Sequence, residues 1–171
     1  MTSSNSGNLD RDRNMNSVNP STENDTEAVR QLNSFLRGEI SAAETYRQAI
    51  DKVASSAQQG NVGMLREIQE EHGRAAQAIR NRIRELGGDP ADSSGPWGTW
   101  AGLVQGTANL LGDAPALKSL KEGEEHGLKD YQEGLDDIDM TSAELVQNQL
   151  IPAQQRHINL LDQLISSVGK A

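Results

Sequence analysis

The sequence predicts an all-α protein, folded as an antiparallel four-helix bundle made of two similar helical hairpins. Aromatic residues are only 3% of the chain, β-branched residues are sparse, and good helix formers dominate from Thr26 onward. Apolar residues recur at alternating steps of three and four along four segments, which is the pattern of amphipathic helices. The length of 171 residues suits one compact domain with a core.

The predicted first hairpin begins at Thr26. Its first helix ends near Ser56, and the polar residues 58–61 separate it from a second helix that stops before Gly87. Because the break is short, the two helices are expected to be antiparallel. The apolar stripes are Leu32, Phe35, Ala42, Tyr46, Ala49 and Val53 in the first helix and Leu65, Ile68, Ala75, Ile79 and Leu86 in the second.

Residues 88–113 form the longest connection, which we interpret as an ordered crossover with a short apolar helix over Trp97–Leu111. The second hairpin then has one helix over Ala114–Asp137 and another over Ser142–Val168. The predicted helix starts are Asp113 with Pro115 and Thr141 with Glu144. The apolar stripes are Leu117, Leu120, Leu128, Tyr131, Leu135 and Ile138, then Val146, Leu150, Ala153, Leu160, Leu164 and Val168.

The domain organisation predicted is a disordered amino-terminal arm over residues 1–25 and a bundle over residues 26–168. The arm is rich in Ser, Asn, Thr and Asp and has no apolar run, so it is neither a secretory signal nor a membrane anchor. No other stretch is apolar for long enough to cross a bilayer. We therefore expect a cytoplasmic protein with no membrane partner.

Charge and composition exclude several functions. With 16 Lys plus Arg against 25 Asp plus Glu, the formal charge of −9 gives no positive field for a phosphate backbone, so nucleic acid is not expected as a partner. The chain has no cysteine, which excludes disulfides, iron–sulfur clusters, thiolate zinc sites and cysteine nucleophiles. A homodimer or a higher oligomer stays open.

The chain resembles itself at an offset of 85 residues. Such a repeat predicts a pseudo-two-fold bundle in which two hairpins, joined by a crossover, bring paired residues together in the middle. The aligned pairs are Glu39 with Glu124, Tyr46 with Tyr131, Leu65 with Leu150, Gln69 with Gln154, His72 with His157 and Ile79 with Leu164.

Four ionisable residues, one in each predicted helix, fall on the core seam, which is the stripe of each helix that faces the bundle core: Glu39, His72, Glu124 and His157. They are assigned to it because other stripe residues stand seven positions before and after each of them. Buried carboxylates need a cation or a proton close by. Two Glu and two His between helices suit manganese, iron or zinc. Two alternatives remain: a metal-free layer of carboxylates bonded to protonated imidazoles or tyrosine hydroxyls, or a heptad phase that is wrong by one residue.

Other polar residues near the seam are predicted to face outward. Glu44 is expected to be a solvated charge, and His126 is expected to be exposed. Glu71 flanks the seam and could turn inward, but we expect a surface ion pair with Arg74 or Arg66. For the two tyrosines of the repeat, we expect core packing with the hydroxyl bonded to a carboxylate.

A Glu followed by Tyr seven residues later in two helices, with a His on each alternate helix, resembles rubrerythrins and bacterioferritins. The segments LRGEISAAETYRQAI, LGG, GPWGTWAG and EGEEHGLKDYQEGL are more closely similar to an uncharacterised bacterial ferritin-like family known as a domain of unknown function. The resemblance covers residues 26–168. It implies a ferritin-like bundle of the di-iron carboxylate kind.

The sequence departs from that pattern at two positions, because Gln69 and Gln154 stand where Glu-x-x-His would have its glutamates. The leading hypothesis is one or two transition-metal ions, iron or manganese, held by Glu39, His72, Glu124 and His157, with the two glutamines at the edge. With iron bound, oxidation of Fe(II) in an oxidative-stress role would be expected. The alternative is a metal-free structural or stress-related interaction protein with a relic polar layer; enzymatic activity stays undecided.

Overall fold

The computed structural model describes residues 20–54, 62–95 and 114–168, which are helical except over residues 86–94 and 138–139. The first hairpin consists of α1 (Pro20–Ala54) and α2 (Val62–Glu85), and the second begins with α4 (Ala114–Glu133). A 3₁₀ turn, η3 (Gly134–Asp137), follows, and then come α5 (Met140–Leu145), the π turn η4 (Val146–Leu150) and α6 (Ile151–Val168), which run on without a break. These ranges contain no strand, as the composition predicted.

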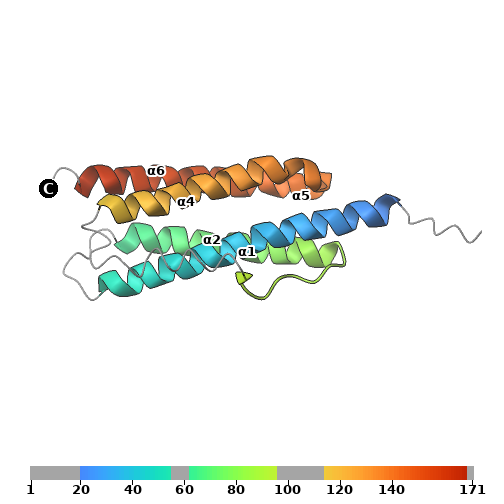
Figure 1. Ribbon diagram of the computed structural model, residues 1–171, viewed down its shortest axis with the longest axis horizontal. Helices are drawn as coiled ribbons and strands as arrows, with labels where there is room; N and C mark the ends of the chain where they lie inside the picture. The colour runs from blue at the N-terminus through green and yellow to red at the C-terminus, as the bar shows by residue number, and fades with distance from the viewer. Residues whose placement is uncertain (1–19, 55–61, 96–113, 169–171) are drawn as a thin grey trace, which may run out of the picture.

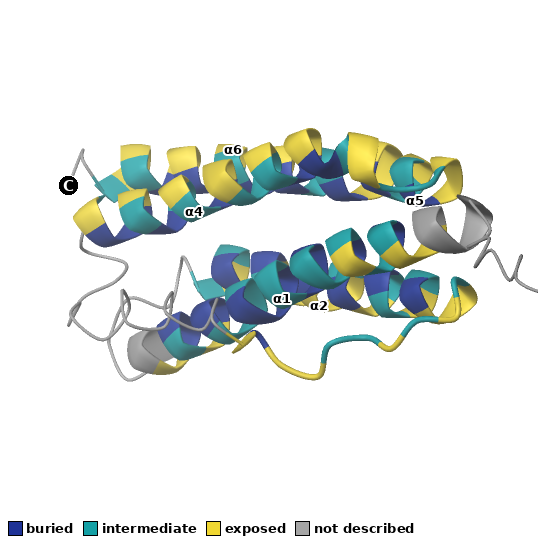
Figure 2. Cartoon of the chain, turned by 45° about the vertical axis from the view of Figure 1, so that its right-hand side comes forward, coloured by how far each residue is buried: buried dark blue, intermediate teal, exposed yellow. Residues whose placement is uncertain are grey.

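The helices pack in two pairs, α1 against α2 and α4 against α6 (Figure 1). Buried residues lie on the sides of the two hairpins that face one another, and exposed residues lie on the outer sides (Figure 2). The predicted four-helix architecture with two helical hairpins is therefore confirmed. None of the described helices is both long and apolar enough to cross a membrane.

Two apolar clusters make up the core. One contains Tyr46 and Leu65 and lies toward the carboxyl end of α1, and the other contains Phe35 and Ile79 and lies toward its amino end. Between them, each of the four long helices contributes buried polar residues: Glu39, His72, Glu124, Gln154 and His157. This polar layer divides the core into two halves.

Some predicted helix boundaries were wrong. Helix α1 begins at Pro20 and not at Thr26. Proline is favoured in the first turn of a helix because its missing N–H would have no partner there, but the polar residues that follow give no apolar stripe to detect. The rest of the predicted arm lies outside the described residues, as do the crossover helix over Trp97–Leu111 and the cap at Asp113.

The start of the fourth helical segment was also predicted wrongly, at Thr141 with Glu144. The cap is Asp139, whose carboxylate accepts hydrogen bonds from the backbone N–H groups of Thr141 and Ser142 at 3.0 and 3.2 Å. Both candidate residues can cap a helix, and only the backbone geometry shows which one lies outside the first turn. The predicted stop of α2 is confirmed at Gly87, which has a φ of 76°.

The fourth segment contains the π turn directly before Pro152. In an ordinary α-helix the proline ring would meet the carbonyl group of Asn148, and the proline could donate no hydrogen bond to it. The wider turn, with a bond from the Ile151 N–H to the Val146 carbonyl, removes this conflict.

Candidate metal centre

The four predicted seam residues meet in the polar layer. Glu39, His72, Glu124 and His157 are at most 5% exposed, and each comes from a different helix. The predicted inward orientation is therefore confirmed. The alternative of a wrong heptad phase is excluded by this burial.

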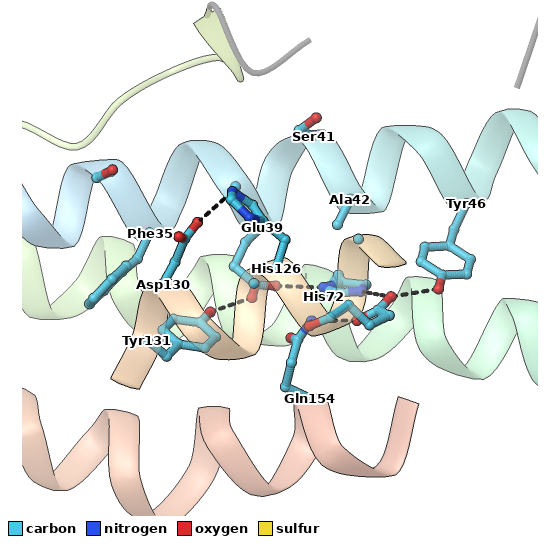
Figure 3. Close-up of a pocket in the computed structure, with 15 residues that line it drawn as sticks. Phe35, Glu39, Ser41, Ala42, Tyr46, His72, His126, Asp130, Tyr131 and Gln154 are labelled. Carbon is cyan, nitrogen blue, oxygen red and sulfur yellow. Dashed lines mark hydrogen bonds and ion pairs between the residues drawn. The ribbon is translucent and has the colours of Figure 1, made fainter. Parts of the chain in front are cut away.

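The two tyrosines cross between the hairpins. Tyr46 of α1 donates its hydroxyl to Oε1 of Glu124 at 2.5 Å, and Tyr131 of α4 donates its hydroxyl to Oε1 of Glu39 (Figure 3). The predicted bonds from tyrosine to carboxylate are confirmed, and each joins one hairpin to the other. The repeat predicted from the sequence is thus present as a reciprocal pair of contacts.

His72 lies between the two glutamates. Its Nδ1 is 2.8 Å from Oε2 of Glu39, and its Nε2 is 3.1 Å from Oε1 of Glu124. His157 does not repeat this arrangement, because its Nδ1 lies 3.2 Å from Oε2 of Glu124 but its Nε2 lies 2.9 Å from Oε2 of Glu71. Both imidazoles therefore contact Glu124, and each has a second carboxylate on its other nitrogen.

Glu71 is the site residue that the sequence analysis underestimated. We expected a surface ion pair, and Glu71 does lie 3.7 Å from Arg74, but it also contacts the buried His157. Arg156, the residue beside His157, donates to the same carboxylate oxygen of Glu71 at 3.0 Å. Only the repeat alignment of Glu71 with Arg156 could have indicated that these two positions face one another.

The two predicted glutamines behave differently. Gln154 is buried, and its amide donates to Oε2 of Glu124 at 2.5 Å and to the Glu124 carbonyl oxygen at 3.0 Å. Gln69 is half-buried and has no such contact among the described residues. A Cβ at Gly127 would lie 2.9 Å from Nε2 of Gln154, whereas the repeat equivalent of Gly127 is Ala42. The missing methyl group leaves room for Gln154 to approach α4.

Charge stabilises this layer. Burial alone would lower the pKa of His72, but the carboxylates of Glu124 and Glu39 raise it to about 10. Burial likewise opposes the charge of Glu124, yet His72 and His157 lower its pKa to about 2. Burial and the neighbouring glutamate raise the pKa values of Tyr46 and Tyr131 well above 10.0, so both stay neutral donors. The charged form of His72 is therefore stabilised by the two glutamates on either side of it.

His126 and Glu44 were both predicted to face outward. His126 is exposed as expected, with its Nε2 3.4 Å from Asp130 on the same helix. Glu44 is half-buried and accepts a hydrogen bond from Ser94 at 3.2 Å, so it is less solvated than we predicted. Glu44 has no direct contact with the central carboxylates in the described structure.

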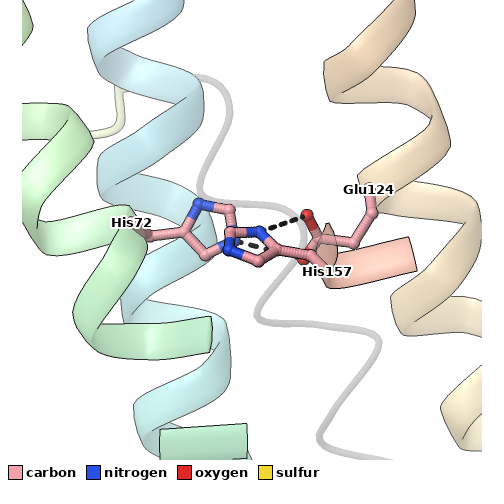
Figure 4. Close-up of side chains that lie close together, drawn as sticks. All are labelled: His72, Glu124 and His157. Carbon is pink, nitrogen blue, oxygen red and sulfur yellow. Dashed lines mark hydrogen bonds and ion pairs between the residues drawn. The ribbon is translucent and has the colours of Figure 1, made fainter. Parts of the chain in front are cut away.

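Three of the buried side chains are close enough to share a metal ion. Ligand atoms of His72, Glu124 and His157, from α2, α4 and α6, all lie within 4.8 Å of one another (Figure 4). Metal–nitrogen bonds of about 2.1 Å in a tetrahedral site place the ligand atoms about 3.4 Å apart, so these three side chains would have to draw closer together around an ion. Two imidazoles and one carboxylate are a ligand set that suits iron, manganese or zinc. The residues present therefore fit one ion.

A cavity of about 70 Å³ reaches this layer from the side where α1 faces α4. Glu39, His72, Glu124 and Gln154 line it, but His157 and Glu71 do not. Figure 3 shows the side chains around this cavity. A cavity volume of about 10 to 15 Å³ is enough to hold one water molecule, so there is room for a small ligand beside the carboxylates.

The fold and the site together define an all-α bundle with a buried cluster of His and Glu between its helices. The family described as "Domain of unknown function (DUF2383)" matches residues 27–137, and the chain belongs to this family. The matched range contains Glu39, His72 and Glu124, whereas Gln154 and His157 lie beyond it. Comparisons with curated proteins and with solved structures found no significant match.

Proposed function

We propose that this protein binds one divalent transition-metal ion between His72, Glu124 and His157. The observation that supports it is the convergence of these three buried side chains from three helices. His72 would bind through Nε2 and His157 through Nδ1, because these are the nitrogens that face Glu124. Each imidazole would then donate its other N–H to a carboxylate, Glu39 or Glu71, as metal-binding histidines usually do.

The charge of the layer supports a single ion. Gln154 donates a hydrogen bond to one carboxylate oxygen of Glu124, and the neutral amide of Gln154 supplies no negative charge that could hold a second ion. In this proposal Glu39 orients His72, although the sequence hypothesis had it as a ligand. Two hairpins with facing Glu and His residues also support a ferritin-like relationship for this bundle.

We propose iron or manganese as the ion, since imidazole and carboxylate ligands suit both and no thiolate is present to favour softer metals. Two histidines, one carboxylate and open positions are the ligand set of non-haem Fe(II) sites, and such an ion would supply redox chemistry with small oxidants. The protein itself would hold the ligands in place and exclude bulk water. An oxidative-stress role would follow from iron.

The test is metal content and equilibrium binding. Elemental mass spectrometry of protein purified without chelator should find iron or manganese. Co(II) added to metal-free protein should bind once per chain and show the visible d–d absorption of a protein-bound Co(II) ion. His157→Gln should abolish stoichiometric binding. His126→Gln is the matched control: His126 lies in the wall of the cavity on α4 but is exposed and is not one of the three proposed ligands, so the Kd should stay unchanged. Equal binding by both variants would contradict the proposal.

A metal-free structural role is the second candidate, and one observation favours it. Among the described residues, every buried side-chain nitrogen and oxygen atom has a hydrogen-bond partner without any metal. A purely structural layer predicts that Glu39→Ala and Glu124→Ala lower stability equally with and without added metal. A metal site predicts a larger loss when metal is present, because those variants also lose the stabilisation by the bound ion.

A further inference from the structure

Small residues form part of the wall of the cavity between α1 and α4, beside the aromatic side chains of Phe35, Tyr46 and Tyr131. Gly38 and Ala42 line it from α1, and Gly123 and Gly127 line it from α4. These pairs are equivalent in the repeat, so both helices lack bulk at the same level of the bundle. Helix α1 packs extensively against α2 but touches α4 over only a few residues. Equivalent residues of the two hairpins therefore line the cavity from both sides.

The inner end of this cavity is the polar layer itself. Glu39 and Glu124 are at most 5% exposed, yet both line the cavity, together with His72. On the other side of the layer, Glu71 covers His157, and Arg156 and Arg74 hold Glu71. A dication approaching from that side would meet two arginines, whereas the cavity leads to two carboxylates with the imidazole of His72 between them and His126 in its wall.

The outer end of the cavity adjoins a second hollow of about 190 Å³. Ser34 and Asp130 line both spaces, so the two are neighbours. Two further acids, Glu133 and Asp137, line the outer hollow. Hollows lined by one sign of charge concentrate counter-ions and speed their arrival. This negative lining adds to the attraction of the two buried carboxylates at the inner end of the cavity.

We propose that the space between α1 and α4 is the passage by which a divalent cation enters and leaves the site, through the outer hollow and past Gly38. The inference rests on the proposed metal binding and adds the route to it. A passage controls rates and not affinity, because narrowing it raises the barrier equally for entry and for exit. The proposed site and the proposed passage can therefore be tested separately.

The test is stopped-flow uptake of Co(II) by the metal-free full chain, with release into a chelator measured on the loaded protein. Gly38→Leu should fill the passage, since a Cβ at Gly38 meets no atom within 4 Å. We expect uptake and release to slow by the same factor, about tenfold or more, which is about 1.4 kcal/mol or more of added barrier. The Kd should stay unchanged.

Gly73→Leu is the matched control. Gly73 also lies within a helix, also has open space at its Cβ, and is exposed on α2 away from the cavity. It should leave both rates unchanged. Ala42→Met is a second way to narrow the passage if Gly38→Leu does not fold, and circular dichroism together with an unchanged Kd shows that a variant is intact.

The outer hollow has its own test. The double variant Glu133→Gln/Asp137→Asn should slow Co(II) uptake severalfold at low salt, and the difference should shrink at high salt as the charges are screened. Glu67→Gln/Glu70→Gln, which removes two exposed acids from α2, should have no comparable effect. Failure of the wild-type protein to bind Co(II) would overturn the proposed function. Binding with rates that neither narrowing variant alters would overturn the passage alone.

Discussion

The two hairpins contribute equivalent residues to the polar layer but do not make equivalent contacts. In the second hairpin, Glu124 has four side-chain partners: Tyr46, His72, Gln154 and His157. In the first hairpin, Glu39 has two among the described residues, Tyr131 and His72. One member of a repeated pair has thus become the centre of the site, and its equivalent supports a neighbouring imidazole.

Small differences in sequence account for this asymmetry. Gly127 lets Gln154 reach Glu124, whereas Ala42 carries a methyl group at the equivalent position of the first hairpin. Glu71 of the first hairpin contacts His157 of the second. Its repeat equivalent, Arg156, is a cation, so it contacts Glu71 and not the histidine of the first hairpin. A repeat in sequence therefore fixes the positions of the residues but not the partners of each carboxylate.

The largest difference should appear when each glutamate is replaced by its isosteric amide. Glu124→Gln leaves both buried imidazoles without their shared carboxylate, so we expect a loss of about 3 to 5 kcal/mol in the unfolding free energy. Glu39→Gln leaves His72 in contact with Glu124 and should cost about 1 to 3 kcal/mol. Urea unfolding of metal-free protein measures both. Equal losses would show that the asymmetry of contacts has no energetic meaning.

The next effect concerns Glu71, which lies in the first hairpin and serves the histidine of the second. If it orients His157 for a metal ion, Glu71→Gln should weaken Co(II) binding by about 10- to 100-fold, as is typical of carboxylates behind a ligating histidine. Glu44→Gln is the control, because Glu44 is also a half-buried acid but contacts Ser94 instead. Isothermal titration of both variants with Co(II) measures the two affinities. An unchanged affinity of Glu71→Gln would count against this role.

The sequence was sufficient to predict what depends on periodicity. Four apolar stripes specified four helices, and seven-residue spacing specified that Glu39, His72, Glu124 and His157 face inward. The repeat also indicated which residues would face each other across the bundle. Tyr131 and Tyr46 confirm this, because each donates to a glutamate of the opposite hairpin.

What the sequence could not provide depends on reach and on local backbone geometry. Glu71 stands beside the seam, and whether such a side chain turns inward depends on where Arg156 lies in the other hairpin. The burial of Gln154 depends on the absence of a Cβ at Gly127. The choice of Asp139 as the cap depends on its extended backbone, with a ψ of 163°. None of these leaves a periodic signal.

A smaller effect tests the origin of the asymmetry at Gly127. Replacing an exposed helical glycine by alanine normally stabilises a protein by about 0.8 to 1 kcal/mol, and Gly73→Ala on α2 should do so. Gly127→Ala should lose this gain and about 1 kcal/mol more, because its methyl group displaces Gln154 from Glu124. Chemical unfolding of the two variants gives the comparison. A gain in both would mean that Gln154 adapts without cost.

The smallest expected effect distinguishes the two ends of the bundle. Asp139 in the second hairpin caps α5 and contacts Arg82 of α2 at 2.8 Å, whereas the equivalent positions at the other end are Ala54 and Ser167. Removal of the cap in Asp139→Ala should cost about 1 kcal/mol at neutral pH. Partial burial opposes the charge, but hydrogen bonds from Ser142 and the charge of Arg82 lower the pKa of Asp139.

Because the pKa of Asp139 is lower in the folded state, its charge stabilises the fold above the pKa of an unfolded aspartate, about 3.9, and this contribution is lost as the pH falls through the lowered value. The difference in unfolding free energy between wild type and Asp139→Ala should therefore be full at pH 7 and should shrink below about pH 4. Urea unfolding at pH 7 and pH 3 measures it. A difference that is the same at both values would mean that the carboxylate charge contributes nothing, and that the two ends of the bundle differ only in how their helices begin.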